Sequence, residues 1–233
     1  LAATVNNPGF ILPQNGDTSH QIGNQLQTAV TFILGQPAGP GGTLVTITSD
    51  SPNLLIASSP DVLGSSSATV SVSAGSSTGT FYLQGLATSG AAPYRVNATG
   101  FEEATRTVTL YPSGVIMRLS DVNNTLAGQG SLQVPAGTDG VIQVKTARLN
   151  TDLTVAEDQP LRGATTTSSA VGLSLSSPIG ILSNTSFVLS GSGTTSTFTA
   201  TGAANSTATI QLTQPAGFTG AIQGTSLTVQ ILP

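Results

Sequence analysis

The stretch Val108-Thr109-Leu110-Tyr111-Pro112 returns at the end of the chain as Val229-Gln230-Ile231-Leu232-Pro233. In both copies apolar and polar residues alternate, and a proline ends the run. Alternation with a period of two is typical of a half-buried β-strand. The two copies are one domain length apart, a distance that suits a β-sandwich domain and is too long for a solenoid repeat.

Other short segments recur in the same order along the chain. They are Val45–Thr48 against Val171–Ser174, Thr80-Phe81 against Thr197-Phe198, and Gly100-Phe101 against Gly217-Phe218. We therefore predict two copies of one module, residues 1–112 and 113–233, and a loop around Pro60–Ser67 that is shortened in the second copy. The first 25 residues are expected to be a leading strand, a linker or the end of a preceding module.

Alternating runs separated by Gly, Pro, Ser and Asn clusters predict an all-β chain, because helical spacing is almost absent. The expected strands lie near 26–34, 43–49, 54–57, 68–73, 79–86, 93–98, 104–111, 115–120, 140–149, 170–176, 179–182, 186–190, 196–201, 207–213 and 225–232. This density of short strands predicts two tandem immunoglobulin-like antiparallel β-sandwiches.

The composition excludes several classes of function. Charged residues make up 7% of the chain, against about 25% in ordinary soluble domains, whereas Ser and Thr contribute about a quarter. A net charge of -4 with one lysine argues against nucleic acid as a partner. No apolar run is long enough for a membrane span, so we expect no membrane insertion by this segment. The absence of Cys excludes disulfides and favours a bacterial source.

Residues 45–113 include the segments Thr-Val-Ser-Val-Ser-Ala-Gly-Ser-Ser-Thr-Gly-Thr-Phe at 69–81 and Tyr94-Arg95-Val96-Asn97-Ala98. With these segments, this part of the chain resembles bacterial immunoglobulin-like repeats of large secreted or cell-surface proteins. Residues 147–149 and 215–218 look like parts of a companion module. The resemblance implies a fold and an extracellular location, and non-catalytic spacer or adhesive units. It also suggests that Tyr94 acts as the tyrosine corner of the fold.

Two motifs raise the question of nucleophilic catalysis. Gly75-Ser76-Ser77-Thr78-Gly79 matches the G-x-S-x-G nucleophile elbow, but strands flank it on both sides and the one histidine, His20, lies upstream. We interpret the motif as a turn. His20 with Asp17 and a serine is interpreted as a solvated loop and not as a triad.

Carboxylates offer the remaining candidates. Glu102-Glu103 is expected to be a solvated turn rather than a glycosidase pair. Asp152, Glu157 and Asp158 form the densest acidic group, which is either a solvated loop or a weak calcium site without the spacing of a calcium loop. We therefore assign no catalytic, cofactor-binding or metal residue, and we expect no cofactor.

The sequence thus predicts a non-enzymatic, secreted or surface-exposed adhesion or spacer module whose partners are neighbouring domains of a larger protein. The alternative is a carbohydrate- or protein-binding module that contacts a surface protein or glycan through loop tips and Tyr82, whose side chain should face away from Phe81 and Leu83. Because lysine is scarce, the edge strands are expected to be covered by Pro- and Gly-rich loops or by the neighbouring domain, unless short edges suffice.

Overall fold

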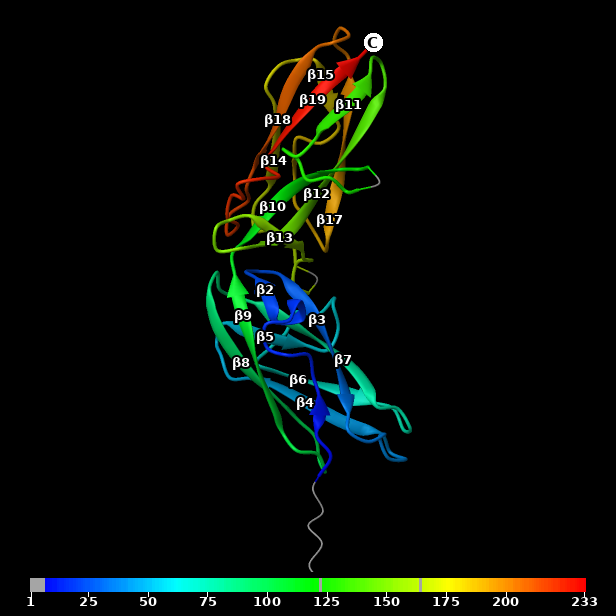
Figure 1. Ribbon diagram of the computed structural model, residues 1–233, viewed down its shortest axis with the longest axis vertical. Helices are drawn as coiled ribbons and strands as arrows, with labels where there is room; N and C mark the ends of the chain where they lie inside the picture. The colour runs from blue at the N-terminus through cyan, green and yellow to red at the C-terminus, as the bar shows by residue number, and fades with distance from the viewer. Residues whose placement is uncertain (1–6, 122, 164) are drawn as a thin grey trace, which may run out of the picture. The chain divides into compact units, whose positions relative to one another are not determined.

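The computed structural model describes residues 7–121, 123–163 and 165–233, and nearly all of its regular structure is strand (Figure 1). The chain divides into two units. Unit 1 comprises residues 1–111 together with 162–164, and unit 2 comprises residues 112–161 and 165–233. No helix in the described ranges is long and apolar enough to cross a membrane.

Unit 1 consists of nine strands and one turn of 3-10 helix. They are β1 (Phe10–Ile11), η1 (Thr18–His20), β2 (Gln21–Gly23), β3 (Gln27–Leu34), β4 (Thr43–Ser49), β5 (Leu54–Ala57), β6 (Ser67–Val72), β7 (Thr78–Gly85), β8 (Gly90–Asn97) and β9 (Ala104–Tyr111). One sheet has the order β1-β3-β7-β5 and the other the order β2-β9-β8-β4-β6.

Unit 2 repeats this arrangement and adds one strand. Its elements are β10 (Ser113–Leu119), β11 (Ser131–Pro135), β12 (Asp139–Leu149), β13 (Val155–Asp158), β14 (Val171–Leu175), β15 (Gly180–Leu182), β16 (Ser186–Phe187), β17 (Gly193–Ala200), β18 (Thr207–Thr213) and β19 (Ser226–Leu232). The sheets run β10-β12-β17-β15, with β13 beside β12, and β11-β19-β18-β14-β16.

Apart from β13, the two units therefore share one topology. The recurring sequence segments fall on equivalent elements: β4 and β14, β7 and β17, and β9 and β19. In each unit the leading strand is split between the sheets, since β1 and β10 pair antiparallel in one sheet while β2 and β11 pair parallel with the last strand in the other. The chain is thus two tandem immunoglobulin-like β-sandwiches, as the alternation predicts. The domain boundary at 112/113 stays a prediction.

Strand β3 shows why the alternation specifies the fold. Val30, Phe32 and Leu34 are buried, and the residues between them, Thr31 and Ile33, are exposed. A strand with this pattern is stable only when its apolar face packs on a second sheet. Phe32, Phe81 and Tyr94 form the aromatic centre of the unit 1 core, with ring centroids about 6 Å apart from one to the next.

Residues 7–25 include β1, η1 and β2, which belong to unit 1, whereas residues 1–6 of the predicted leading segment lie outside the described residues. Four short strands, β1, β2, β11 and β13, were not predicted from the sequence. Each has five or fewer residues, and each is defined by the strand it pairs with rather than by its own alternation.

The edges of the sheets are protected in two ways. Strands β1, β2, β15 and β16 have only two or three residues. The seven-residue edge strand β10 is covered by a loop that contains Pro215 and several glycines. Met117 N donates to Gly224 O at 2.7 Å, and Gln214 Nε2 donates to Val115 O at 2.7 Å. The predicted loop cover is therefore confirmed at β10, whereas β1, β2, β15 and β16 are protected by their shortness.

Candidate functional site

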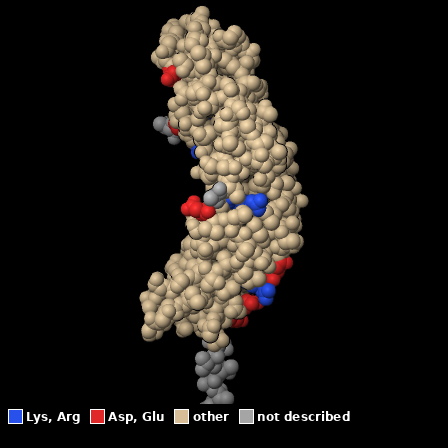
Figure 2. Space-filling model, turned by 180° about the vertical axis from the view of Figure 1, so that it is seen from behind, with Lys and Arg blue, Asp and Glu red and all other residues tan. Residues whose placement is uncertain are grey.

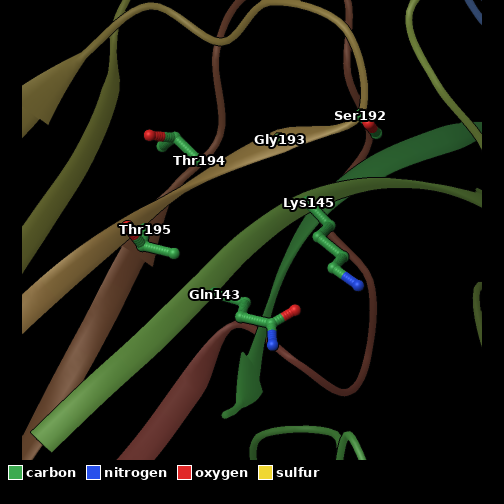
Figure 3. A pocket seen from close by; sticks show the side chains of 6 residues that line it. All are labelled: Gln143, Lys145, Ser192, Gly193, Thr194 and Thr195. Atoms are coloured by element: carbon green, nitrogen blue, oxygen red, sulfur yellow. The ribbon is translucent and has the colours of Figure 1, made fainter.

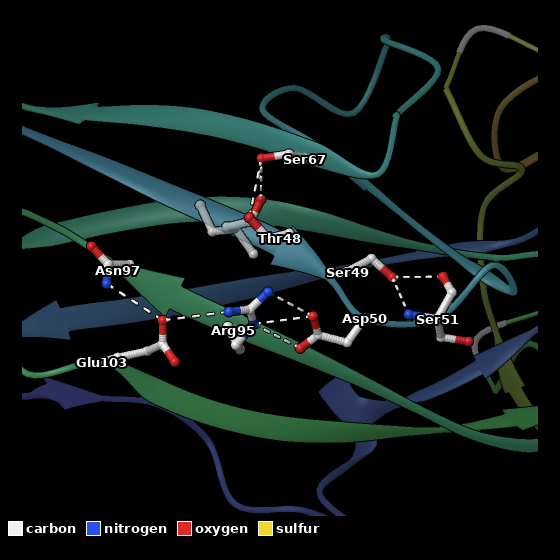
Figure 4. A network of polar contacts seen from close by, with 9 residues as sticks. Thr48, Ser49, Asp50, Ser51, Ser67, Arg95, Asn97 and Glu103 are labelled. Carbon is white, nitrogen blue, oxygen red and sulfur yellow. Dashed lines mark hydrogen bonds and ion pairs between the residues drawn. The ribbon is translucent and has the colours of Figure 1, made fainter.

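The outer face of sheet β2-β9-β8-β4-β6 carries a polar network centred on Arg95 (Figure 4). Arg95 Nε donates to both oxygens of Asp50, at 3.0 and 2.9 Å, and its Nη1 lies 3.9 Å from Glu103 Oε2. The hydrogen bonds that Arg95 donates to Asp50 raise the pKa of Arg95 above its ordinary value. One arginine here faces two carboxylates, so the network keeps one net negative charge on an exposed surface. Its contacts tie the residue after β4 to β8 and do not form an acid–base pair for catalysis.

A shallow hollow of about 260 Å³ lies on the outer face of unit 2 (Figure 3). Gln143 and Lys145 of β12 line it together with residues 192–195, which lead into and begin β17. Lys145 Nζ lies 3.4 Å from Asp158 Oδ2. The lining therefore offers amide, hydroxyl and ammonium groups, which can hydrogen-bond a polar ligand but do not form an acid–base pair for catalysis.

A second hollow, of about 310 Å³, also lies in unit 2, and Asp121 and Ser131 are among the residues that line it. The Asp121 carboxylate is already occupied, because it accepts hydrogen bonds from the backbone N–H groups of Thr125 and Asn123 at 2.9 and 3.2 Å. The contacts with Thr125 hold the pKa of Asp121 below its usual range. Asp121 therefore shapes a turn.

His20 is buried, so the interpretation of this residue as a solvated loop side chain is wrong. Its Nε2 lies 2.6 Å from Tyr94 Oη, and the two rings stack at 5.7 Å. The tyrosine-corner role suggested for Tyr94 is wrong as well, because its hydroxyl meets a side chain and not the backbone just upstream. A buried tyrosine requires a partner for its hydroxyl, and this requirement was the one available signal for the pair.

The surroundings of His20 also rule out the triad. Ser19 Oγ lies 3.3 Å from Nδ1 of His20, but the Asp17 carboxylate accepts a hydrogen bond from Gln14 N instead of contacting the ring. The ring is fully covered, so a substrate carbonyl cannot reach it together with Ser19.

The G-x-S-x-G motif forms the turn between β6 and β7, as the flanking strands indicate. Gly75 adopts φ +77°, which a residue with a side chain rarely does, and a Cβ on Gly79 would lie 2.3 Å from the ring of Phe32. The two glycines are therefore explained by turn geometry and core packing.

The acidic group of unit 2 does not converge on one point. Asp158 lies 2.7 Å from Arg118 Nη2, and Glu157 lies 3.7 Å from Arg148 Nη2. Asp152 instead accepts hydrogen bonds from Thr154 N and Oγ1, which hold its pKa below the usual range. Residues 155–158 form strand β13, so the solvated-loop interpretation is wrong for Glu157 and Asp158, which lie beside arginine side chains.

Tyr82 lies on the outer face of β7 and is partly exposed, while Phe81 and Leu83 are buried, as the alternation predicts. Its register partners are Ala29 on β3 and Ala57 on β5. Both neighbours are small, and Ala29 is exposed whereas Ala57 is buried. Glu102 and Glu103 are exposed, in agreement with a solvated turn.

No protein-family model and no curated protein sequence matches the chain. Among solved structures, it is similar to the adhesin InvE of Yersinia pseudotuberculosis at 16% identity and a TM-score of 0.33, covering 97% of this chain and 60% of that one. The D00-D0 domain of Intimin matches at 13% identity and a TM-score of 0.33, over 95% and 98% of the two chains. A β-glycosidase from Bacteroides vulgatus matches at 11% identity and a TM-score of 0.33, over 97% and 25%. These similarities concern the fold.

Proposed function

We propose that the chain is a non-catalytic, extracellular tandem module of a larger bacterial surface or secreted protein, in which it acts as a spacer or presentation unit. The proposal assigns it no cofactor and no metal. Its partners are the neighbouring domains of the same protein.

The observation that carries the proposal is the pairing of the first and last strands in each unit. β2 runs parallel to β9 over three residue pairs, and β11 runs parallel to β19 over five. The chain enters such a pair at one end and leaves it at the opposite end. Tension along the chain therefore pulls the two strands past each other and loads their hydrogen bonds together, which is the geometry that a spacer under tension requires.

The surface supports the same proposal. On the face shown in Figure 2, acidic and basic side chains are few and scattered. The exposed positions of β6 and β17 are Ser and Thr, and such hydroxyls keep a surface hydrated without attracting a charged partner. The clustered charges pair with one another, at Arg95 in unit 1 and at Asp158 in unit 2.

The alternative function, a carbohydrate- or protein-binding module, is favoured by one observation, the partly exposed ring of Tyr82 between two alanines. A flat ring flanked by small residues is the kind of platform on which a sugar can stack. The platform is narrow, however, because β5 and β3 supply no second aromatic residue next to it.

A binding screen separates the two functions. The purified chain is assayed on a glycan array and on immobilised extracellular-matrix proteins, with and without calcium. A spacer gives no saturable signal. Micromolar binding that is lost in Tyr82→Ala and kept in Thr31→Ala, a change on the same face, would establish the binding module and overturn the spacer.

A further inference from the structure

The turn that precedes η1 contains the one asparagine of the chain that is followed by a glycine, Asn15-Gly16. The side-chain amide of an asparagine can be attacked by the backbone nitrogen of the next residue. A glycine at that next position leaves the approach open, because it has no Cβ. Gly16 adopts φ +91°, and a Cβ on it would meet nothing within 4 Å. The two groups that would react therefore lie in open surroundings.

The hydrogen bonds of this turn leave the attacking nitrogen unoccupied. Residues 14–18 are all exposed. Asp17 N donates to Gln14 O at 3.2 Å, Gln14 N donates to Asp17 Oδ2 at 2.8 Å, and Gln21 Nε2 donates to Gly16 O at 2.7 Å. No group in the described part of the chain accepts a hydrogen bond from the Gly16 N–H. Exposed turns open locally at a low cost in free energy, so Asn15 can reach the geometry of attack while unit 1 stays folded.

The side-chain carbonyl of Asn15 is polarised by strand β9. Thr107 N donates a hydrogen bond to Asn15 Oδ1 at 2.9 Å. Attack on Cγ of Asn15 moves negative charge onto this same oxygen, and a backbone N–H that points at the oxygen stabilises the charge as it develops. The fold therefore places an activating donor at the one asparagine whose neighbour is a glycine.

We propose that Asn15 is a site of spontaneous deamidation in the folded chain. The Gly16 nitrogen forms a bond to Cγ of Asn15, the bond between Cγ and Nδ2 breaks, and the proton of the Gly16 nitrogen leaves with Nδ2 as ammonia. Water then adds to the cyclic imide and opens it. Opening at Cγ gives aspartate, whereas opening at the main-chain carbonyl carbon gives isoaspartate. The modification goes beyond the proposed spacer function and does not depend on it.

The two products have different consequences for unit 1. Aspartate keeps a side-chain oxygen that can accept the hydrogen bond from Thr107 N. Isoaspartate adds a methylene carbon to the main chain and leaves its free carboxylate directly on Cα, so the acceptor is withdrawn from Thr107. Thr107 lies two residues before Thr109, the first residue of β9 that pairs with β2. Isoaspartate at position 15 therefore loosens the leading segment beside the parallel pair.

Peptide mapping by mass spectrometry during incubation of the purified chain in mildly alkaline buffer measures the conversion of each asparagine. Asn15 is expected to convert at least about tenfold faster than the others, all of which precede residues with side chains. Gly16→Ala is expected to slow the conversion by about tenfold, whereas Gly100→Ala, at another exposed turn glycine with φ +82°, leaves it unchanged. Conversion of Asn15 no faster than that of the other asparagines, or equal rates in the two glycine variants, would overturn the proposal.

Amide hydrogen exchange tests the effect on the fold. In the chain aged to isoaspartate, the Thr107 amide is expected to exchange with solvent about tenfold faster than in the fresh chain, because it has lost its acceptor. Freshly prepared Asn15→Asp keeps a side-chain oxygen opposite Thr107 and the original main chain, so its Thr107 amide is expected to exchange as slowly as in the wild type. Equal exchange in the aged and fresh chains, or equally fast exchange in Asn15→Asp, would overturn the role of isoaspartate in loosening the leading segment. Neither result would affect the proposed spacer function.

Discussion

The buried pair of His20 and Tyr94 joins the leading strand of unit 1 to its core. His20 ends η1 and directly precedes β2, the strand that pairs with β9. Burial lowers the pKa of His20, the charge of Arg106 lowers it further, and Asp17 raises it. Burial also raises the pKa of Tyr94. Both side chains are therefore neutral in the folded protein near pH 7. The hydrogen bond between His20 Nε2 and the Tyr94 hydroxyl oxygen then contains a single proton.

This pair predicts an acid-dependent loss of stability. Because the pKa of His20 is lowered by folding, the unfolded chain takes up the proton first as the pH falls below about 6.5. The contribution of His20 is thus complete above that pH and declines through the folded-state pKa, by at most about 1.4 kcal/mol per pH unit. Among the elements around the ring, β2 and β3 carry no ionisable residue, β8 carries Tyr94 and Arg95, and β9 carries Arg106 and Tyr111.

The measurement compares urea unfolding at pH 7.5 and pH 5.0 for the wild type and for His20→Gln, which keeps an amide within reach of Tyr94 but does not titrate. The loss of stability between the two pH values is expected to be smaller in His20→Gln, and unchanged in the control Ser19→Ala. An equal pH dependence in His20→Gln and wild type would show that the histidine is not held neutral.

At the scale of elements, the loop of residues 58–66 is held on unit 1 by two buried glutamines. Gln27 and Gln84 are register partners on β3 and β7, and Gln84 Nε2 donates to Gln27 Oε1 at 3.0 Å. Gln27 Nε2 donates to Pro60 O at 2.8 Å, and Gln84 contacts both Val62 O and Gly64 N. This segment is the one that the sequence offset predicts to be shortened in the second copy, where only residues 183–185 separate β15 from β16.

Replacing Gln84 with Met keeps the volume but leaves Val62 O and Gly64 N without their partner. Gln84→Met is expected to destabilise the protein by about 2 kcal/mol, the usual cost of buried polar groups that lose a hydrogen bond. The Gly64 amide should also exchange with solvent faster. The exposed Gln211→Met on β18 serves as the control, with an effect within about 0.5 kcal/mol. Similar effects of the two substitutions would contradict the role of Gln84 in holding the loop.

The same two scales show what the sequence can predict. The sequence pattern identified β4, β5, β9 and β18 to the residue, because each buries apolar residues in a sheet and ends at, or within two residues of, Ser or Pro. It could not identify contacts between distant residues. His20 and Tyr94 are 74 positions apart and Gln27 and Gln84 are 57 apart, and neither pair has a sequence signature. Strand β13 was missed for the same reason, since its charged residues pair with Arg118 and Arg148 from other strands.

At the scale of the whole molecule, the parallel first-and-last pairing predicts how the chain responds to tension. Antiparallel terminal strands would separate one hydrogen bond at a time, whereas parallel strands pulled at opposite ends must break their bonds together. The five pairs of β11 with β19 outnumber the three of β2 with β9. When the chain is stretched from its two ends, unit 2 is therefore expected to unfold at the higher force, which reports the barrier to unfolding rather than the equilibrium stability.

An engineered disulfide assigns the two unfolding events to the two units. Gln133 and Gln230 are register partners on β11 and β19, so a Gln133→Cys, Gln230→Cys variant creates the one disulfide in a cysteine-free chain. Oxidation links these two positions covalently, so the residues between them can no longer extend when unit 2 unfolds. Most of the increase in chain length that accompanies the unfolding of unit 2 is then lost. The high-force event should shorten under oxidising conditions and recover its length when the disulfide is reduced. If the low-force event shortens instead, bond number in the parallel pair does not set the barrier, and resistance to tension must come from the packing between the two sheets of each sandwich.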